Sequence, residues 1–170
     1  MKKNFPQYFH IKNEENLNEI VDEVFATFAV LATLTDENHF QSTLLALKGD
    51  LGAGKTTFTK KLAAQLGIKE NLTSPTFTIL KRYEIQEKPE AYEDSAPFKH
   101  LIHIDAYRLA AGNELEKLGF KKLLAELGNL ICLEWPEIVE DILPPHYIEL
   151  AFEHDPTDPL ARKVTLSLKM

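Results

Sequence analysis

Apolar residues recur along the chain with two different periods, which predict its helices and strands. Between residues 17 and 31 they follow one face of a helix, and Asn13 can cap its first turn. Two further helices are predicted at residues 56–66, which Gly67 ends, and at residues 113–127. Nearly continuous apolar runs predict buried strands, and alternating runs predict half-buried ones. The predicted strands span residues 43–48, 77–85, 100–109, 130–133, 147–153 and 163–168.

The order of these elements favours one fold class. Helices lie between buried strands, which favours an α/β domain with a mainly parallel sheet. The last two strands flank the turn sequence at 155–159, so a C-terminal antiparallel hairpin is predicted. Residues 86–99 carry two prolines and six charged side chains and are expected to form an exposed loop insertion. We expect residues 1–170 to form a single domain, because a chain of this length can bury a sufficient core.

The composition narrows the classes of function. Asp and Glu number 26 against 19 Lys and Arg, which gives a net charge of −7. Because bulk attraction to nucleic acid needs a basic surface, any role with RNA is expected to be indirect. Cys132 is the single cysteine, which excludes an intrachain disulfide and fits a reducing cytoplasm. The apolar runs fall short of the about 20 residues that span a membrane, so no membrane association is expected.

A glycine-rich segment can bind phosphate locally despite the negative net charge of the chain. Residues 49–56 read Gly-Asp-Leu-Gly-Ala-Gly-Lys-Thr and match the phosphate-binding P-loop, between a buried strand and an amphipathic helix. Glycines let successive backbone N–H groups turn toward a phosphate, and the helix N-terminus adds positive charge. Lys55 can reach the terminal phosphates, and the Thr56 hydroxyl can ligate Mg²⁺. The alternative without phosphate binding is a glycine-rich turn beside an exposed lysine. Such a turn would explain the glycines, but it would not require lysine followed by threonine.

Mg²⁺ at a P-loop also needs a carboxylate from a neighbouring strand end. Two apolar runs end in an acid, at Asp105 and at Glu134, and the pattern alone does not rank them. Residues 73–76 read Thr-Ser-Pro-Thr, which is typical of a simple turn and is also compatible with a mobile loop that senses the γ-phosphate. His100 and His103 are three apart in a strand, so a shared metal is not expected.

Four blocks together resemble the TsaE family. They are the P-loop with Thr57, residues 74–78, the His-Ile-Asp-Ala-Tyr-Arg-Leu run at 103–109, and Glu-Trp-Pro-Glu at 134–137. The resemblance implies a P-loop NTPase-like three-layer fold with a mixed sheet, binding of ATP or ADP with Mg²⁺, and slow ATP hydrolysis. It also implies partnership with the TsaB–TsaD pair, which transfers threonylcarbamoyl to adenosine 37 of tRNA.

The resemblance further implies roles for single residues. Thr56 and Glu134 would ligate Mg²⁺, while Lys55, Asp105 and Thr76 would act in catalysis, Asp105 by orienting water and Thr76 as a switch-loop hydroxyl. Trp135 would lie near the nucleotide, and Glu14 would contact the base. The phosphates would be held by Gly52, Ala53, Gly54, Lys55, Thr56 and Thr57.

Two departures from the family pattern stand out. Residues 86–99 are longer than the usual connection, and residues 109–116 lack the usual Asp-Pro before the next helix.

Two other functions remain open from the residues alone. A small-molecule kinase would use the same P-loop, although three arginines supply an arginine-rich lid poorly. A nucleotide-dependent assembly switch would make hydrolysis incidental. A GTPase is disfavoured because the chain holds no Asn-Lys-x-Asp sequence to read guanine.

Overall fold

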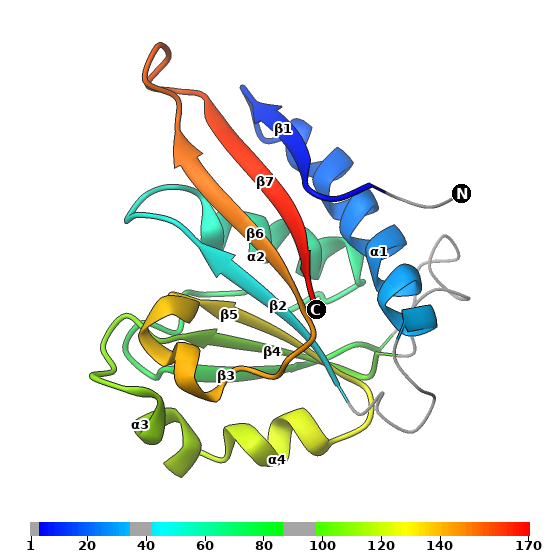
Figure 1. Cartoon of the computed structure of the whole chain (residues 1–170), viewed down its shortest axis with the longest axis vertical. Helices are drawn as coiled ribbons and strands as arrows, with labels where there is room; N and C mark the ends of the chain where they lie inside the picture. Colours follow the sequence, from blue (N-terminus) through cyan, green and yellow to red (C-terminus); the bar gives the residue numbers. More distant parts are fainter. Residues whose placement is uncertain (1–3, 35–41, 87–97) are drawn as a thin grey trace.

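The computed structural model describes residues 4–34, 42–86 and 98–170 and forms one seven-stranded sheet with helices on both faces (Figure 1). The strand order is β1-β7-β6-β2-β5-β4-β3. The strands are β1 (Gln7–Ile11), β2 (Ser42–Lys48), β3 (Leu80–Glu84), β4 (His100–Asp105), β5 (Asn129–Glu134), β6 (Tyr147–His154) and β7 (Arg162–Lys169). The helices are α1 (Asn16–Leu34), α2 (Lys55–Gln65), α3 (Gly112–Lys117), α4 (Phe120–Ala125) and the 3₁₀ segment η3 (Pro136–Ile142).

The centre of the sheet is parallel and its margins are antiparallel. β6, β2, β5 and β4 pair in parallel, whereas β1 pairs with β7, β7 with β6, and β3 with β4 in antiparallel fashion. The β6–β7 pair confirms the predicted C-terminal hairpin, and the mixed α/β sheet confirms the predicted fold class. The register places Asp105 of β4 opposite Glu134 of β5. Both acids therefore leave the sheet at the carboxyl end of the parallel strands, where open α/β sheets bind ligands.

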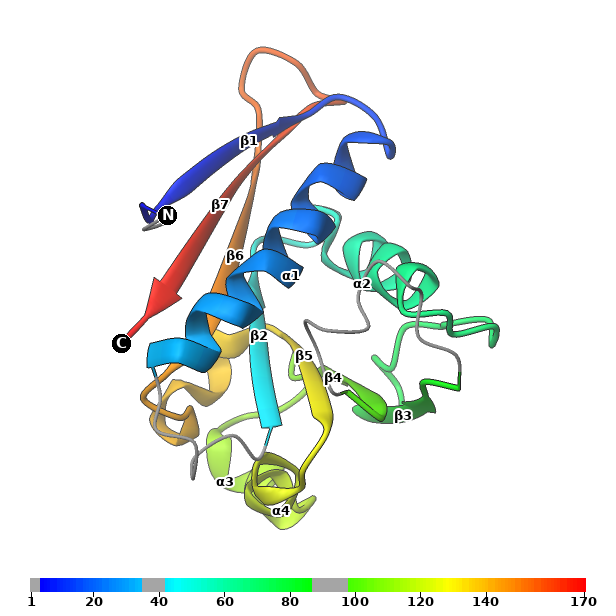
Figure 2. The ribbon, with the colours of Figure 1, turned by 90° about the vertical axis from the view of Figure 1, so that its right-hand side faces the viewer.

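The two faces of the sheet carry separate hydrophobic cores. α1 and α2 cover one face, where Phe25 and Phe58 are among the largest buried side chains. α3, α4 and η3 cover the other face, where Phe120 packs with Ile102 and Ile131. Figure 2 shows α1 running along the sheet with α2 beside it, while α3 and α4 lie together at the far end. The three predicted layers are therefore present.

The ends of α1 and α2 follow the signals in the sequence. The Asn13 carboxamide oxygen accepts from the Asn16 N–H at 3.1 Å, and the Asn16 side chain accepts in return from the N–H groups of Lys12 and Asn13. This reciprocal cap fixes the chain where β1 turns into α1. At the end of α2, Gly67 adopts φ 76°, and the N–H groups of residues 67 and 68 close back on the helix.

The structure corrects two predicted elements and adds one strand that was not predicted. The strand predicted at 77–85 begins only at Leu80, because the N–H groups of Thr78 and Ile79 both donate to the Pro75 carbonyl and form a turn. The helix predicted at 113–127 is broken into α3 and α4 by Gly119, whose φ of 89° is left-handed. β1 was not predicted, because five residues with Tyr8 and His10 on an exposed face become a strand only by pairing with β7.

Residues 87–97, most of the predicted loop insertion at 86–99, lie outside the described residues. Over the three described stretches of the chain, no helix combines the length and the apolar character needed to cross a bilayer.

Candidate functional site

The loop that joins β2 to α2 is shaped by its glycines. Gly52 and Gly54 have φ angles of 76° and 109°, which side chains other than hydrogen adopt only with strain, although a Cβ at either would meet open space. Gly49 is different, because a Cβ there would lie 2.5 Å from the Phe152 carbonyl oxygen of β6. The conformation therefore requires glycine at residues 52 and 54, and close packing on β6 requires it at residue 49.

Lys55, the first residue of α2, is held over the loop rather than in solvent. Its ammonium donates to the carbonyls of Gly49 at 2.5 Å and Asp50 at 2.9 Å, and it lies 4.1 Å from the centre of the Trp135 ring. Burial lowers the pKa of Lys55 from its ordinary value, and the nearby Glu134 carboxylate opposes that shift. Lysine therefore supplies a desolvated cation at the mouth of the loop, with one N–H left for a further acceptor.

Glu134 is the centre of a buried hydrogen-bond chain. The Thr56 hydroxyl donates to both of its carboxylate oxygens, at 2.8 and 3.1 Å. The Nε2–H of His103 donates to Glu134 Oε1 at 2.8 Å, and both side chains are almost fully buried. A carboxylate accepts but does not donate, so His103 carries its proton on Nε2 here. Its Nδ1 has no hydrogen-bond partner among the described residues.

A second chain joins the 73–79 turn to Asp105. The Thr76 hydroxyl donates to Asp105 Oδ2 at 2.5 Å and lies 2.6 Å from the Ser74 hydroxyl. The other oxygen, Oδ1, accepts from the Tyr107 N–H at 3.0 Å. Ile79 ends the turn with φ 67°, a strained conformation for a β-branched residue, and its carbonyl accepts from the Asp105 N–H. Side chain and backbone thus both attach this turn to Asp105.

These groups surround a cavity of about 280 Å³, here called the carboxylate-side cavity. Trp135 forms one wall, because its left-handed backbone (φ 61°) turns the chain directly after β5 and its ring packs 5.1 Å from the Tyr107 ring. The lining comprises Leu51, Gly52, Gly54, Lys55, Thr56, Thr57, Ser74, Thr76, Asp105, Tyr107, Glu134 and Trp135.

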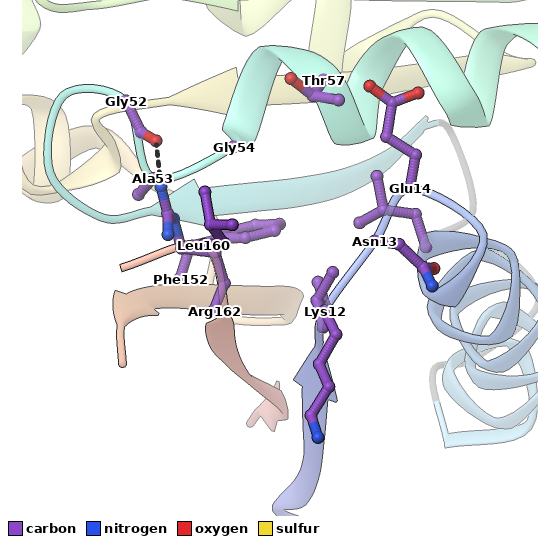
Figure 3. Close-up of a pocket in the computed structure, with 12 residues that line it drawn as sticks. Lys12, Asn13, Glu14, Gly52, Ala53, Gly54, Thr57, Phe152, Leu160 and Arg162 are labelled. Carbon is purple, nitrogen blue, oxygen red and sulfur yellow. Dashed lines mark hydrogen bonds between the residues drawn. The ribbon is translucent and has the colours of Figure 1, made fainter. Parts of the chain in front are cut away.

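A second cavity of about 260 Å³, here called the hairpin-side cavity, opens on the other side of the same loop (Figure 3). Gly52, Gly54 and Thr57 line both cavities. The loop also contributes Ala53. The remaining lining comes from the end of β1 and the start of α1 and from the β6–β7 hairpin, and it comprises Ile11, Lys12, Asn13, Glu14, Leu17, Phe152, Leu160 and Arg162. A ligand held by the P-loop can therefore extend from one cavity into the other.

The structure brings the predicted site residues together in two groups. Lys55, Thr56, Thr76, Asp105, Glu134 and Trp135 line the carboxylate-side cavity. Glu14 and Ala53 line the hairpin-side cavity.

Two residues were not predicted as part of the site. The period of two in the strand at residues 100–109 places His103 on the face of Asp105, so that signal was available. Arg162 had no local signal, because only the return of β7 beside the P-loop brings it there. Cys132 is fully buried between apolar neighbours, and burial raises the pKa of its thiol, as expected for an inert core cysteine.

The chain is similar to known proteins in sequence and in fold. The family model described as "Threonylcarbamoyl adenosine biosynthesis protein TsaE" matches residues 12–164. The tRNA threonylcarbamoyladenosine biosynthesis protein TsaE of Bacillus subtilis (strain 168) is 38% identical over 125 residues, covering 73% of this chain and 68% of that protein. The protein of the same name from Rickettsia typhi is 36% identical over 120 residues, covering 70% and 74%. The crystal structure of Bacillus subtilis YdiB matches with a TM-score of 0.59 at 27% identity, covering 98% of this chain and 88% of that one. The chain therefore belongs to the TsaE family.

Proposed function

We propose that this protein binds ATP and ADP with Mg²⁺ at the P-loop and hydrolyses ATP slowly. We further propose that it acts in the cytoplasm with the TsaB–TsaD pair in the threonylcarbamoylation of tRNA adenosine 37. The observation that carries the proposal is the meeting of Lys55, Thr56, Glu134, Asp105 and Thr76 around one cavity beside the P-loop. The names of the curated relatives supply the biosynthetic context.

The donor set suits Mg²⁺ bound together with a nucleotide. A hydroxyl and carboxylates are hard oxygen donors, which Mg²⁺ prefers, and Thr56 and Glu134 already lie within hydrogen-bonding distance of each other. Over residues 4–34, 42–86 and 98–170, no three His, Cys, Asp or Glu side chains form a metal-binding cluster. Protein groups alone therefore do not complete a metal site, and nucleotide phosphates would have to supply the other ligands. The ion, when bound, would neutralise charge on those phosphates.

Lys55 would bind phosphate, and Asp105 would orient the attacking water. Lys55 would hold the terminal phosphates, since its desolvated ammonium keeps one free N–H. Asp105 would orient the attacking water through a carboxylate that Tyr107 and Thr76 hold in place. None of the described residues that line the carboxylate-side cavity is an arginine. Hydrolysis by the isolated chain is therefore expected to be slow, since the transition-state charge lacks the guanidinium that partners can supply.

Thr76 would report the state of the γ-phosphate. Its hydroxyl faces the cavity and is bonded to Asp105, and the turn that carries it ends at the strained Ile79. Strained residues of this kind mark switch segments with more than one conformation. A γ-phosphate that competes for the Thr76 hydroxyl would remove the side-chain bond between the turn and Asp105 and leave the backbone bond from Asp105 to Ile79. The turn could then change the surface that it offers to a partner.

A reconstituted reaction tests the proposal. Modification of tRNA by purified TsaB and TsaD should proceed through many turnovers only when this chain and ATP are added. The Thr76→Ala variant should lose this stimulation and keep ADP affinity, whereas Thr165→Ala, a hydroxyl lost from β7 outside both cavities, should behave as wild type. Full multiple-turnover modification without the chain would contradict its assigned role. Wild-type behaviour of Thr76→Ala would remove only the switch assignment.

A further inference from the structure

The hairpin-side cavity contains a cation that the family motifs do not include. The guanidinium of Arg162, at the start of β7, reaches across to the P-loop, where Nη2 lies 3.4 Å from the Gly52 carbonyl oxygen (Figure 3). Lys12 also lines this cavity, but Figure 3 shows its ammonium directed away from the loop. Arg162 is therefore the positive side chain that faces the P-loop from this side.

The hairpin holds this guanidinium in a fixed orientation. Its Nη1 donates to two carbonyls, those of Pro159 and Ala161, both at 2.8 Å. The turn behind it is tied by Asp155, which accepts from the N–H and the hydroxyl of Thr157 at 2.8 and 2.6 Å. Because Nη1 is committed to the hairpin and one Nη2–H donates to the Gly52 carbonyl, the second Nη2–H and the Nε–H remain as donors for a ligand.

The two cavities define which part of a nucleotide would meet Arg162. The groups that suit the terminal phosphates and Mg²⁺ all line the carboxylate-side cavity. The hairpin-side cavity shares Gly52, Gly54 and Thr57 with it. Its other lining includes residues of β6 and β7, which lie on the opposite side of β2 from β5 and β4. A nucleotide that places its last phosphate on the carboxylate side therefore runs toward its nucleoside on the hairpin side. The phosphate nearest the nucleoside passes the position of Arg162.

We infer that Arg162 is a phosphate-binding residue for the α-phosphate of a nucleoside di- or triphosphate, an assignment that rests on the proposed function. A planar guanidinium pairs with phosphate oxygens in a way that an ammonium cannot reproduce. In a chain of net charge −7, a fixed cation at this place also offsets the repulsion of an anionic ligand. Binding of the α-phosphate links the nucleotide to the C-terminal hairpin as well as to the P-loop.

Nucleotide affinities measured by calorimetry test this assignment. Because hydrogen bonds between charged groups are strong, Arg162→Gln should weaken the binding of ADP and of ATP equally, by about 10-fold to 100-fold. Arg162→Lys keeps the charge without the planar fork, and its loss should be intermediate. Arg82→Gln, which removes the same charge from an ion pair with Glu126 outside both cavities, is the matched control and should bind as wild type. Wild-type affinity of Arg162→Gln overturns the inference.

Phosphorus NMR of bound ADP keeps the test decisive if Arg162→Gln unfolds. In Arg162→Lys, which retains the aliphatic stem, the α-phosphorus resonance should move and the β-phosphorus resonance should stay. A shift confined to the β-phosphorus, or no shift, overturns the assignment to the α-phosphate. Failure of the wild-type chain to bind ADP is a separate result, because it contradicts the proposed function itself.

Discussion

Replacing His103 by leucine should destabilise the protein and loosen the Glu134 carboxylate. The ring donates to Glu134 Oε1 at 2.8 Å, and both residues are buried, since His103 has no exposed surface and Glu134 is 3% exposed. Leucine fills a similar volume but leaves this oxygen without its histidine donor. Among the described residues, the Thr56 hydroxyl is then the one remaining donor to the Glu134 carboxylate.

The size of the effect follows from the type of bond. A buried hydrogen bond to a charged group contributes about 1.5–3 kcal/mol to folding. For a chain of this length, each kcal/mol shifts the melting temperature by about 2–4 °C. The melting temperature of His103→Leu should therefore fall by about 3–12 °C. Its ADP binding should need more Mg²⁺, because the carboxylate is no longer oriented.

Amide variants separate orientation from mere packing. His103→Gln can place its amide nitrogen near the position of Nε2, so it should recover the Mg²⁺ dependence. His103→Asn reaches only as far as Nδ1, so it should not. Thermal melting and calorimetric ADP titration at several Mg²⁺ concentrations measure both properties. If His103→Leu were as stable and as responsive to Mg²⁺ as wild type, the assigned role of the His103–Glu134 bond would be wrong.

Two further predictions concern the acids and the loop. Glu134→Gln should raise the Mg²⁺ concentration needed for ADP binding, whereas Asp105→Asn should lower turnover more than affinity. Calorimetry measures ADP binding, and a phosphate-release assay measures turnover. The reverse pattern would exchange the roles of the two acids. Gly49→Ala should lose about 3 kcal/mol of stability from positive-φ strain and contact with the Phe152 carbonyl. Gly52→Ala, which meets open space, should lose about 1 kcal/mol in the same urea unfolding measurement, and equal losses would refute the packing explanation.

Much of the fold and site could be predicted because their signals are local. The P-loop needs only eight consecutive residues, and the acids at 105 and 134 each end an apolar run. Because parallel strands end at the same edge of a sheet, these two acids lie opposite each other there, as the register of β4 and β5 shows.

The missing parts depend on contacts between distant segments. β1 is a strand because β7 pairs with it, and Arg162 reaches the P-loop because the hairpin returns beside it. The turn before β3 replaces the first residues of a predicted strand because two N–H groups share the Pro75 carbonyl, which alternation of apolar residues cannot indicate. The role of His103 follows from a buried partner on the next strand.

Nucleotide binding by the P-loop through Lys55 can be tested directly by one calorimetric titration. ADP with Mg²⁺ should bind the wild-type chain at one site per molecule. Lys55→Ala should abolish tight binding while its melting temperature shows that the fold is kept. Unchanged ADP affinity in a folded Lys55→Ala variant would contradict the account.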